Sequence, residues 1–347
     1  MEEKQKYWLD IDCGVDDFSS VLFLLGLERF VEIVGISIVE GNIPIMNSKV
    51  SLDSFLSKFS KKKIPFFVGA GEPILPTKMK LPSWEGHGEH GFGDWEDFER
   101  VSEEEKSSFS PKNAILALLD FSTQQKDNSF NLLALGPLTN VALALKLDPS
   151  VALKIKSFYW MGGTSHSKGN SSISAEYNAH IDPEACAIVF EKLAGKVNVI
   201  PWETTVIGRT KIEWFQENLF NHQNEKCQFL KRILCKYSSF EYAKVVGMNI
   251  CDLLATVVAV FPAVVTESHK LTAFCELGGV HSRGLKKYNY SPIFSKKTFP
   301  ENVLHKNIQG SLFFDWYSKK GEKPNVNLIT NVDADKFREI LVQNFTE

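Results

Sequence analysis

The sequence has little excess charge of either sign. Lysine and arginine total 39 residues against 42 aspartates and glutamates, which leaves a net charge of −3. Nucleic-acid-binding proteins normally carry a basic surface for phosphate contacts, so no nucleic-acid partner is expected. No apolar run approaches the roughly 18 residues that span a bilayer, and residues 1–6 lead into a predicted strand without an apolar signal segment. We therefore expect no membrane partner.

Cysteine is also sparse, with six residues, at positions 13, 186, 227, 235, 251 and 275. They show neither paired CxxC spacing nor the density of a disulfide scaffold, and a reducing, cytoplasmic location fits them best. Neither the cysteines nor the histidines have the spacing of a zinc site.

What the sequence does contain is a regular alternation of short apolar runs and helix-like segments. It predicts strands at 7–11, 32–39, 65–68, 131–135, 157–161, 197–200 and 326–330, and helices at 16–29, 43–59, 111–125, 137–147, 182–194 and 333–345. Such alternation indicates an α/β fold with an open, mostly parallel sheet flanked by helices on both faces. Because no linker or change in composition interrupts the chain, residues 1–347 are predicted to form a single domain. The lysine-containing segment 281–306 is interpreted as a solvated loop insertion.

Four carboxylates follow the first predicted strand, in Asp10-Ile11-Asp12-Cys13-Gly14-Val15-Asp16-Asp17. They would repel one another unless a cation lay among them. Oxygen ligands favour calcium or magnesium. Helix capping is an alternative explanation for Asp16 and Asp17, but it leaves Asp10 and Asp12 without a role.

Other candidate functional residues also follow predicted strands, where ligands of parallel sheets bind. They are Gly41-Asn42, the run Gly136 to Asn140, and Met161-Gly162-Gly163. Further along, Asp252 opens an apolar helical segment, and capping would account for it as well. Asp182 precedes Pro183 and is interpreted as a helix cap, whereas Glu176 and Asn178 have no evident structural role.

Together these motifs resemble the inosine-uridine preferring nucleoside hydrolase family over nearly the whole chain. The family's DxDxGxDD signature is matched by Asp10, Asp12, Gly14, Asp16 and Asp17, with Cys13 in place of the usual proline. Leu135-Gly136-Pro137-Leu138-Thr139-Asn140 matches a calcium-binding loop. The spacing of Met161, Asn170, Glu176 and Asn178 matches the ribose-binding residues of the family.

The resemblance implies a role for each matched residue. Calcium would be held by Asp12, Asp17, the carbonyl of Thr139 and Asp252, with Asp10 as a supporting carboxylate behind them. Asp16 would be shared between the metal and the ribose. The predicted ribose-binding residues are Asn42, Met161, Asn170, Glu176 and Asn178. His87 matches a loop near the base, although a histidine in so glycine-rich a loop could equally be a mobile surface residue.

The implied reaction is calcium-dependent hydrolysis of the N-glycosidic bond of a ribonucleoside, with Asp12 as general base on metal-bound water. Better-understood members carry histidine or tryptophan before the last calcium aspartate, whereas this chain has Cys251. A thiol is a weak donor to a departing base, so Cys251 is assigned either to the substrate or to packing alone. Other candidate donors are Tyr237, Tyr242, Trp84 and Trp95.

The sequence leaves two alternative functions open. A haloacid dehalogenase-type phosphatase would use Asp10 as a nucleophile and would leave most matched residues without a role. A nucleoside-binding protein of the same fold with little turnover is the second alternative. The family resemblance also implies a homodimer or homotetramer.

Overall fold

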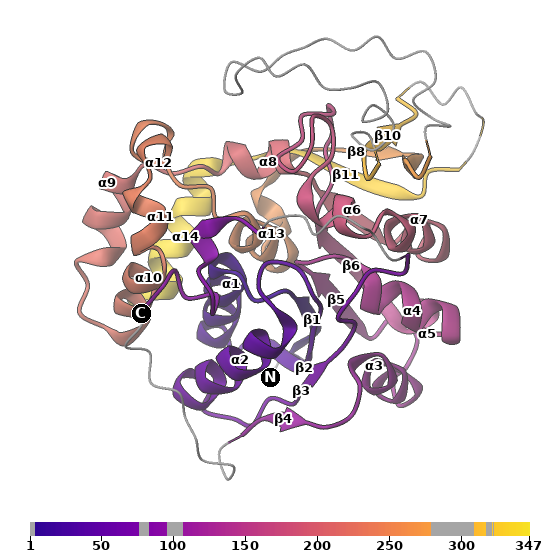
Figure 1. Ribbon diagram of the computed structural model, residues 1–347, viewed down its shortest axis with the longest axis horizontal. Coiled ribbons are helices and arrows are strands. Elements are labelled where there is room, and N and C mark those ends of the chain that lie inside the picture. The colour runs from indigo at the N-terminus through magenta and orange to yellow at the C-terminus, as the bar shows by residue number, and fades with distance from the viewer. Residues whose placement is uncertain (1–3, 76–82, 96–106, 279–308, 317–320, 322) are drawn as a thin grey trace.

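The computed structural model describes residues 4–75, 83–95, 107–278, 309–316, 321 and 323–347. The segment 281–306, predicted to be a loop insertion, lies outside the described residues. A sheet of nine strands crosses the molecule in the order β4-β3-β2-β1-β5-β6-β7-β11-β8 (Figure 1). Its strands are β1 (Gln5–Ile11), β2 (Val31–Ile38), β3 (Phe66–Val68), β4 (Phe109–Ser110), β5 (Phe130–Ala134), β6 (Ile155–Met161), β7 (Val197–Ile200), β8 (Val265–Leu271) and β11 (Val326–Val332).

Every pairing in this sheet is parallel except that of β8 with β11, which is antiparallel. A second, two-stranded sheet pairs β9 (Ala273–Cys275) with β10 (Leu312–Phe314) in antiparallel fashion. The predicted α/β fold with a mostly parallel sheet is therefore confirmed. The sequence missed β8 because its exposed polar side chains at the edge of the sheet give no apolar run.

The helices of the first half are α1 (Val15–Gly26), α2 (Ile45–Phe59), α3 (Ala114–Thr123), α4 (Thr139–Leu147), α5 (Val151–Lys154), α6 (Tyr177–Ile181) and α7 (Pro183–Lys192), with the short 3-10 turn η1 (Glu85–His87). Those of the second half are α8 (Trp202–Ile207), α9 (Ile212–Phe215), α10 (Glu225–Ile233), α11 (Cys235–Ser239), α12 (Glu241–Val246), α13 (Cys251–Val260) and α14 (Ala334–Thr346), with the short turns η3 (Gln216–Phe220) and η4 (Pro262–Val264). The stretch before Asp252, for which the sequence predicted no helix, folds into short helices. Its short helices alternate buried and exposed residues too briefly to show a clear period.

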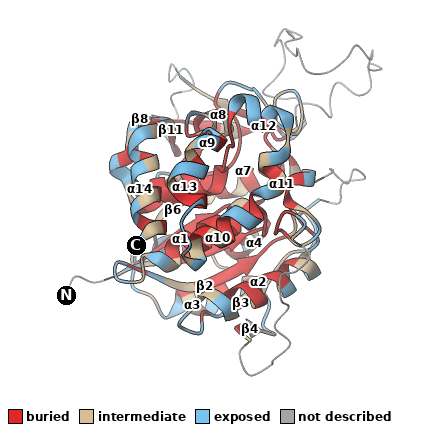
Figure 2. Cartoon of the chain, turned by 90° about the vertical axis from the view of Figure 1, so that its left-hand side faces the viewer, coloured by how far each residue is buried: buried red, intermediate tan, exposed pale blue. Residues whose placement is uncertain are grey.

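The sheet separates two hydrophobic clusters because successive side chains of a strand point to opposite faces. In β1, Leu9 and Ile11 pack with helices α1, α13 and α14, whereas Trp8 packs with α3 and α4 on the other face. Figure 2 shows buried residues concentrated in the sheet and on the inward sides of its helices. Among the described residues, no helix combines the length and the apolar character that crossing a membrane requires.

Parallel strands bring their carboxyl ends to one edge of the sheet. Asp12 follows β1, Asn42 follows β2, Thr139 follows β5, and Gly162 follows β6. Since β2, β1, β5 and β6 are consecutive neighbours in the sheet, residues that are more than a hundred positions apart meet there.

Candidate active site

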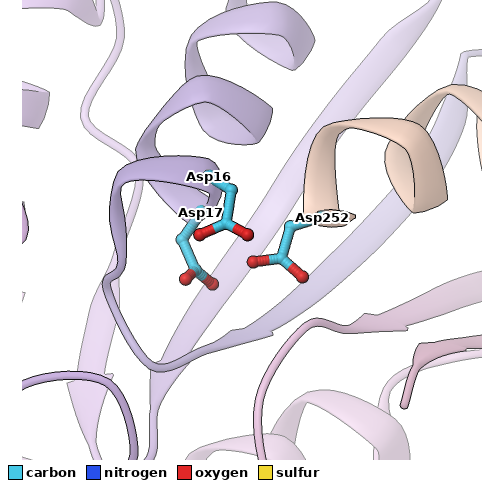
Figure 3. Close-up of side chains that lie close together, drawn as sticks. All are labelled: Asp16, Asp17 and Asp252. Atoms are coloured by element: carbon cyan, nitrogen blue, oxygen red, sulfur yellow. The ribbon is translucent and has the colours of Figure 1, made fainter. Parts of the chain in front are cut away.

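Three carboxylates converge between the first turns of two buried helices. Asp16 and Asp17 lie in the first turn of α1, and Asp252 lies in the first turn of α13. One oxygen from each lies within 4.8 Å of the others, and Figure 3 shows the three side chains directed toward one another. Asp17 and Asp252 are buried and Asp16 is nearly so. The positive ends of the two helix dipoles therefore face this acidic cluster.

Asp12 lies beside this cluster and is held by Asn42. The backbone N–H of Asn42 donates to Oδ2 of Asp12 over 3.0 Å, and its side-chain amide donates to Oδ1 over 2.9 Å. A Cβ on Gly41 would collide with Oδ2 of Asp12, so this close approach requires glycine. The side-chain amide of Asn42 thus binds Asp12, a role that the sequence did not indicate.

Burial and mutual repulsion make these acids hard to ionise without a cation. Burial, followed by the charges of neighbouring aspartates, raises the pKa of Asp12 and Asp252 well above the ordinary value. Burial and the charge of Asp16 raise the pKa of Asp17 to about 7. Among the described residues, Oδ1 of Asp16 and Oδ1 of Asp17 are buried without a hydrogen-bond partner. Such oxygen atoms suit a hard divalent cation, which would supply the missing partner.

The capping alternative is right only in part. The backbone N–H of Gly14 donates to Oδ2 of Asp17 over 2.8 Å, as in a capping box, but this leaves Oδ1 unpaired. At α13 the N-cap residue is Ile250, and no side chain caps that helix within the described part of the chain. The capping interpretation is therefore wrong for Asp252.

Asp10 is not part of the three-carboxylate cluster and belongs to a hydrogen-bond network with Ser37 and Asn140. Its Oδ1 accepts hydrogen bonds from the Ser37 hydroxyl and, over 2.8 Å, from the Asn140 amide. Burial raises the pKa of Asp10 to about 7, although both hydrogen bonds oppose the shift. Asp10 can therefore act on the site through Asn140, the residue after Thr139, and its supporting role stays a prediction.

Thr139 is the buried first residue of α4, and its hydroxyl donates to Oδ2 of Asp182 over 2.6 Å. Asp182 caps α7 as predicted, because its Oδ1 accepts the Ala185 N–H over 3.0 Å. The bond to Thr139 was not foreseen, since the two residues are 43 positions apart. The metal-binding role of the Thr139 carbonyl stays a prediction.

Glu176 and Asn178 have structural roles that the sequence did not reveal. Glu176 caps α6 by accepting the N–H groups of Asn178 and Ala179, and it also accepts the Gly163 N–H over 2.8 Å. Burial raises its pKa to about 7. The Asn178 amide bridges two strand ends by donating to the carbonyls of Leu135 (2.9 Å) and Met161 (3.0 Å).

The two remaining ribose candidates differ in exposure. Met161 is buried at the end of β6, whereas Asn170 is exposed in the following loop. The Oδ1 atom of Asn170 accepts the backbone N–H of Tyr177 over 2.9 Å, which fastens that loop to the start of α6. The tyrosine hydroxyl in turn donates to the Gly41 carbonyl over 3.0 Å, so it connects α6 to the turn that carries Asn42.

His87 is buried beside the acidic cluster, so its interpretation as a mobile surface residue is wrong. Its Nδ1 accepts the Val15 N–H over 3.2 Å and lies 3.8 Å from Oδ1 of Asp16. Burial lowers the pKa of His87, although Asp16 opposes the shift. The neutral ring therefore carries its proton on Nε2. Trp84 packs edge-on against this ring, with centroids 5.0 Å apart.

Cys251 is the buried first residue of α13, with Sγ 3.8 Å from the Asn249 carbonyl. Burial and the charge of Asp16 raise the pKa of its thiol well above the ordinary value, so the sulfur stays protonated. The Tyr237 hydroxyl is occupied by the backbone of Asn249, accepting its N–H over 2.7 Å and contacting its carbonyl at 3.3 Å. Tyr237 therefore supports the segment before α13 instead of offering a free hydroxyl.

The last two candidate donors are placed less favourably. Tyr242 is 46% exposed on α12 and packs against Phe240, whose ring plane lies 12° from its own. Trp95 packs on Phe229, 6.0 Å between ring centroids, within the core beside α10.

The chain is similar to known nucleoside hydrolases over most of its length. A family model described as inosine-uridine preferring nucleoside hydrolase matches residues 7–339, a range that contains every site residue from Asp10 to Asp252. Uridine nucleosidase 1 of Arabidopsis thaliana is 28% identical over 309 residues, covering 83% of this chain and 87% of that protein. The pyrimidine-specific ribonucleoside hydrolase RihB of Escherichia coli K12 is 30% identical over 188 residues, covering 54% and 56% of the two chains. A solved structure of an inosine-guanosine nucleoside hydrolase superimposes with a TM-score of 0.82 at 29% identity and covers 98% of each chain.

Proposed function

Because this chain belongs to the inosine-uridine preferring nucleoside hydrolase family and is an N-glycosyl hydrolase, we propose that it splits ribonucleosides into ribose and free base with calcium as cofactor and Asp12 as general base. The observation that carries the proposal is the meeting of Asp16, Asp17 and Asp252 beside Asp12. Four acids gathered in a buried space are costly unless a cation neutralises them.

The donor set fits calcium better than a softer metal. The candidate ligands are the carboxylates of Asp12, Asp17 and Asp252 and the carbonyl of Thr139, with Asp16 shared between metal and ribose. All are oxygen atoms, which calcium prefers. When bound, calcium would lower the pKa of the attacking water and fix its position.

Asp12 is suited to take the proton from that water. Asn42 holds both of its oxygen atoms, which fixes the direction of the carboxylate while leaving further lone pairs available. The buried carboxylates around it would also stabilise the positive charge that develops on the sugar as the glycosidic bond breaks. Attack from the face opposite the base predicts inversion at the anomeric carbon.

The substrate-binding residues in this proposal are Asn42, Met161, Asn170, Glu176 and Asn178 for the ribose, with His87 and Cys251 toward the base. Carboxylates that grip ribose hydroxyls disfavour 2′-deoxy substrates. Similar proteins are named for uridine, for pyrimidine ribonucleosides and for inosine and guanosine, so the proposed substrate class includes both purine and pyrimidine ribonucleosides. The homodimer or homotetramer and the cytoplasmic location stay predictions.

The two alternative functions require a different nucleophile or a different outcome with ribonucleosides. A phosphatase of the haloacid dehalogenase type would need Asp10 as nucleophile, but Asp10 is fully buried and hydrogen-bonded to Ser37 and Asn140. The family assignment excludes that alternative as well. A nucleoside-binding protein without turnover would bind ribonucleosides and release no ribose.

The test is to incubate the protein and its Asp12→Ala variant with a panel of ribonucleosides and calcium, and to follow free ribose and free base. We expect release of ribose by the wild-type protein. Since general-base catalysis contributes about 10²- to 10⁴-fold, the variant should be slower by at least that range. Tight nucleoside binding with no ribose release from any substrate would refute the enzymatic proposal.

A further inference from the structure

Asp182 makes more hydrogen bonds than a helix cap needs. The side chain is 0% exposed and stands at the start of α7, where Oδ1 accepts the Ala185 N–H over 3.0 Å. Its other oxygen, Oδ2, accepts from two groups outside α7: the Thr139 hydroxyl over 2.6 Å and the Ile74 N–H over 2.9 Å. One carboxylate therefore connects the loop after β3, the start of α4 and the start of α7.

The bond to Thr139 is the strongest of these contacts by its geometry. A hydroxyl that donates to a carboxylate over 2.6 Å falls in the range of charge-assisted hydrogen bonds, which are roughly twice as strong as neutral ones. Both partners are buried, so water does not compete for either. Threonine is also β-branched, and fixing its hydroxyl fixes its χ1 angle against the backbone.

The turn that Thr139 closes lies directly against Asp12. A Cβ on Gly136, at the start of this turn, would stand 3.0 Å from the Cβ of Asp12. Neighbouring groups of the turn are held as well: the Gly136 carbonyl accepts the Trp160 indole N–H over 3.2 Å, and Asn140 donates to Asp10 over 2.8 Å. A shift at residue 139 would therefore move the turn relative to Asp12.

We propose that Asp182 is a positioning residue for the cation site, because it holds the Thr139 hydroxyl and thereby fixes the backbone that presents the Thr139 carbonyl. Asp182 is not a member of the carboxylate cluster, and it acts on the site only through Thr139. This inference rests on the proposed calcium-dependent function. Residues that orient metal ligands from behind typically contribute about 10- to 100-fold to metal affinity.

The experiment compares calcium binding by the wild-type protein, three single variants, the double variant Thr139→Val/Asp182→Ser and one control, using calorimetric titration of chelator-treated protein with calcium chloride. Thr139→Val removes the hydroxyl while keeping the branched shape, and Thr139→Ser restores the hydroxyl. Asp182→Ser removes the oxygen that Thr139 and Ile74 share and keeps a side chain able to cap α7. The control is Asp333→Ala, which removes a cap of α14, where Asp333 accepts the Asp335 and Lys336 N–H groups.

We expect Thr139→Val and Asp182→Ser to weaken calcium binding by about 10- to 100-fold. Thr139→Ser should bind within about threefold of wild type, and the double variant should bind no more weakly than the weaker single variant, because both changes remove the same bond. Nucleoside hydrolysis by Thr139→Val should recover as calcium is raised. Asp333→Ala should lower the melting temperature without changing calcium affinity.

The outcomes separate this inference from the function on which it rests. Wild-type protein that binds no calcium would overturn the proposed cofactor, and the inference with it. Wild-type protein that binds calcium, together with a Thr139→Val variant that binds equally well, would overturn the inference alone. If Asp182→Ser does not fold, the two Thr139 variants still decide between these results.

Discussion

Replacing Asp17 by asparagine should stabilise the metal-free protein while abolishing its response to calcium. Burial and the charge of Asp16 raise the pKa of Asp17 from its ordinary value of 3.8 to about 7. An acid with a raised folded-state pKa binds its proton more tightly in the folded chain than in the unfolded chain. Its contribution to stability is therefore complete at low pH and is lost as pH rises from about 4 to about 7.

The size of this effect follows from the pKa difference. A difference of roughly three pKa units corresponds to about 4 kcal/mol of folding free energy at pH 8. Asparagine removes this cost and can still accept the Gly14 N–H, but it loses about 1 kcal/mol of interaction with the helix dipole. The net expectation for Asp17→Asn without metal is a gain of about 3 kcal/mol at pH 8, where Asp17 is ionised. At pH 4 the folded chain holds Asp17 protonated, so no charge–dipole interaction is lost and the change should be less than about 1 kcal/mol.

Urea unfolding at the two pH values, with a chelator and with calcium, measures each of these quantities. Calcium should raise the stability of the wild-type protein by mass action and leave Asp17→Asn unchanged. Asp333→Asn is the matched control, because it alters an aspartate that caps α14 with no site contact, and it should change stability by less than about 1 kcal/mol at either pH. If Asp17→Asn destabilises the metal-free protein at pH 8, Asp17 serves as a helix cap and the cation argument fails.

Three further predictions concern Asn42, Glu176 and Cys251. Asn42→Ala removes the side-chain bond to Oδ1 of Asp12 and keeps the backbone bond to Oδ2, so kcat should fall by about 10- to 100-fold. A change in KM alone would assign the Asn42 side chain to the ribose only. Burial raises the pKa of Glu176 from 4.5 to about 7. The stability of the wild-type protein relative to the Glu176→Gln variant should therefore decline by about 3 kcal/mol from pH 4.5 to pH 8. A stability difference that does not change with pH in urea unfolding would contradict this. For Cys251→His, an imidazole beside Asp16 should change the preference among bases in steady-state assays with a nucleoside panel, and unchanged rates for every base would assign Cys251 to packing.

Much of the fold was predictable because its signals are local. The apolar runs that became β1, β2, β5, β6 and β7 have the length and composition of buried parallel strands, and the helices between them follow the apolar period of their own sequences. The parallel order then places the carboxyl end of every parallel strand at one edge. Elements without such a pattern were missed, notably the exposed edge strand β8 and the short helices between α8 and α13.

The sequence by itself determined that an acidic cluster follows the first strand and that it needs either a cation or a helix to stabilise it. Only the tertiary structure showed that Asp252, at the start of α13, meets Asp16 and Asp17, and that it caps no helix there. The partners of Asp182 and Asn42 were likewise decided by packing between distant segments. The physical reason is that residue type and spacing specify local backbone structure, whereas a buried carboxylate takes its hydrogen bonds and its pKa from whichever segments the fold brings against it.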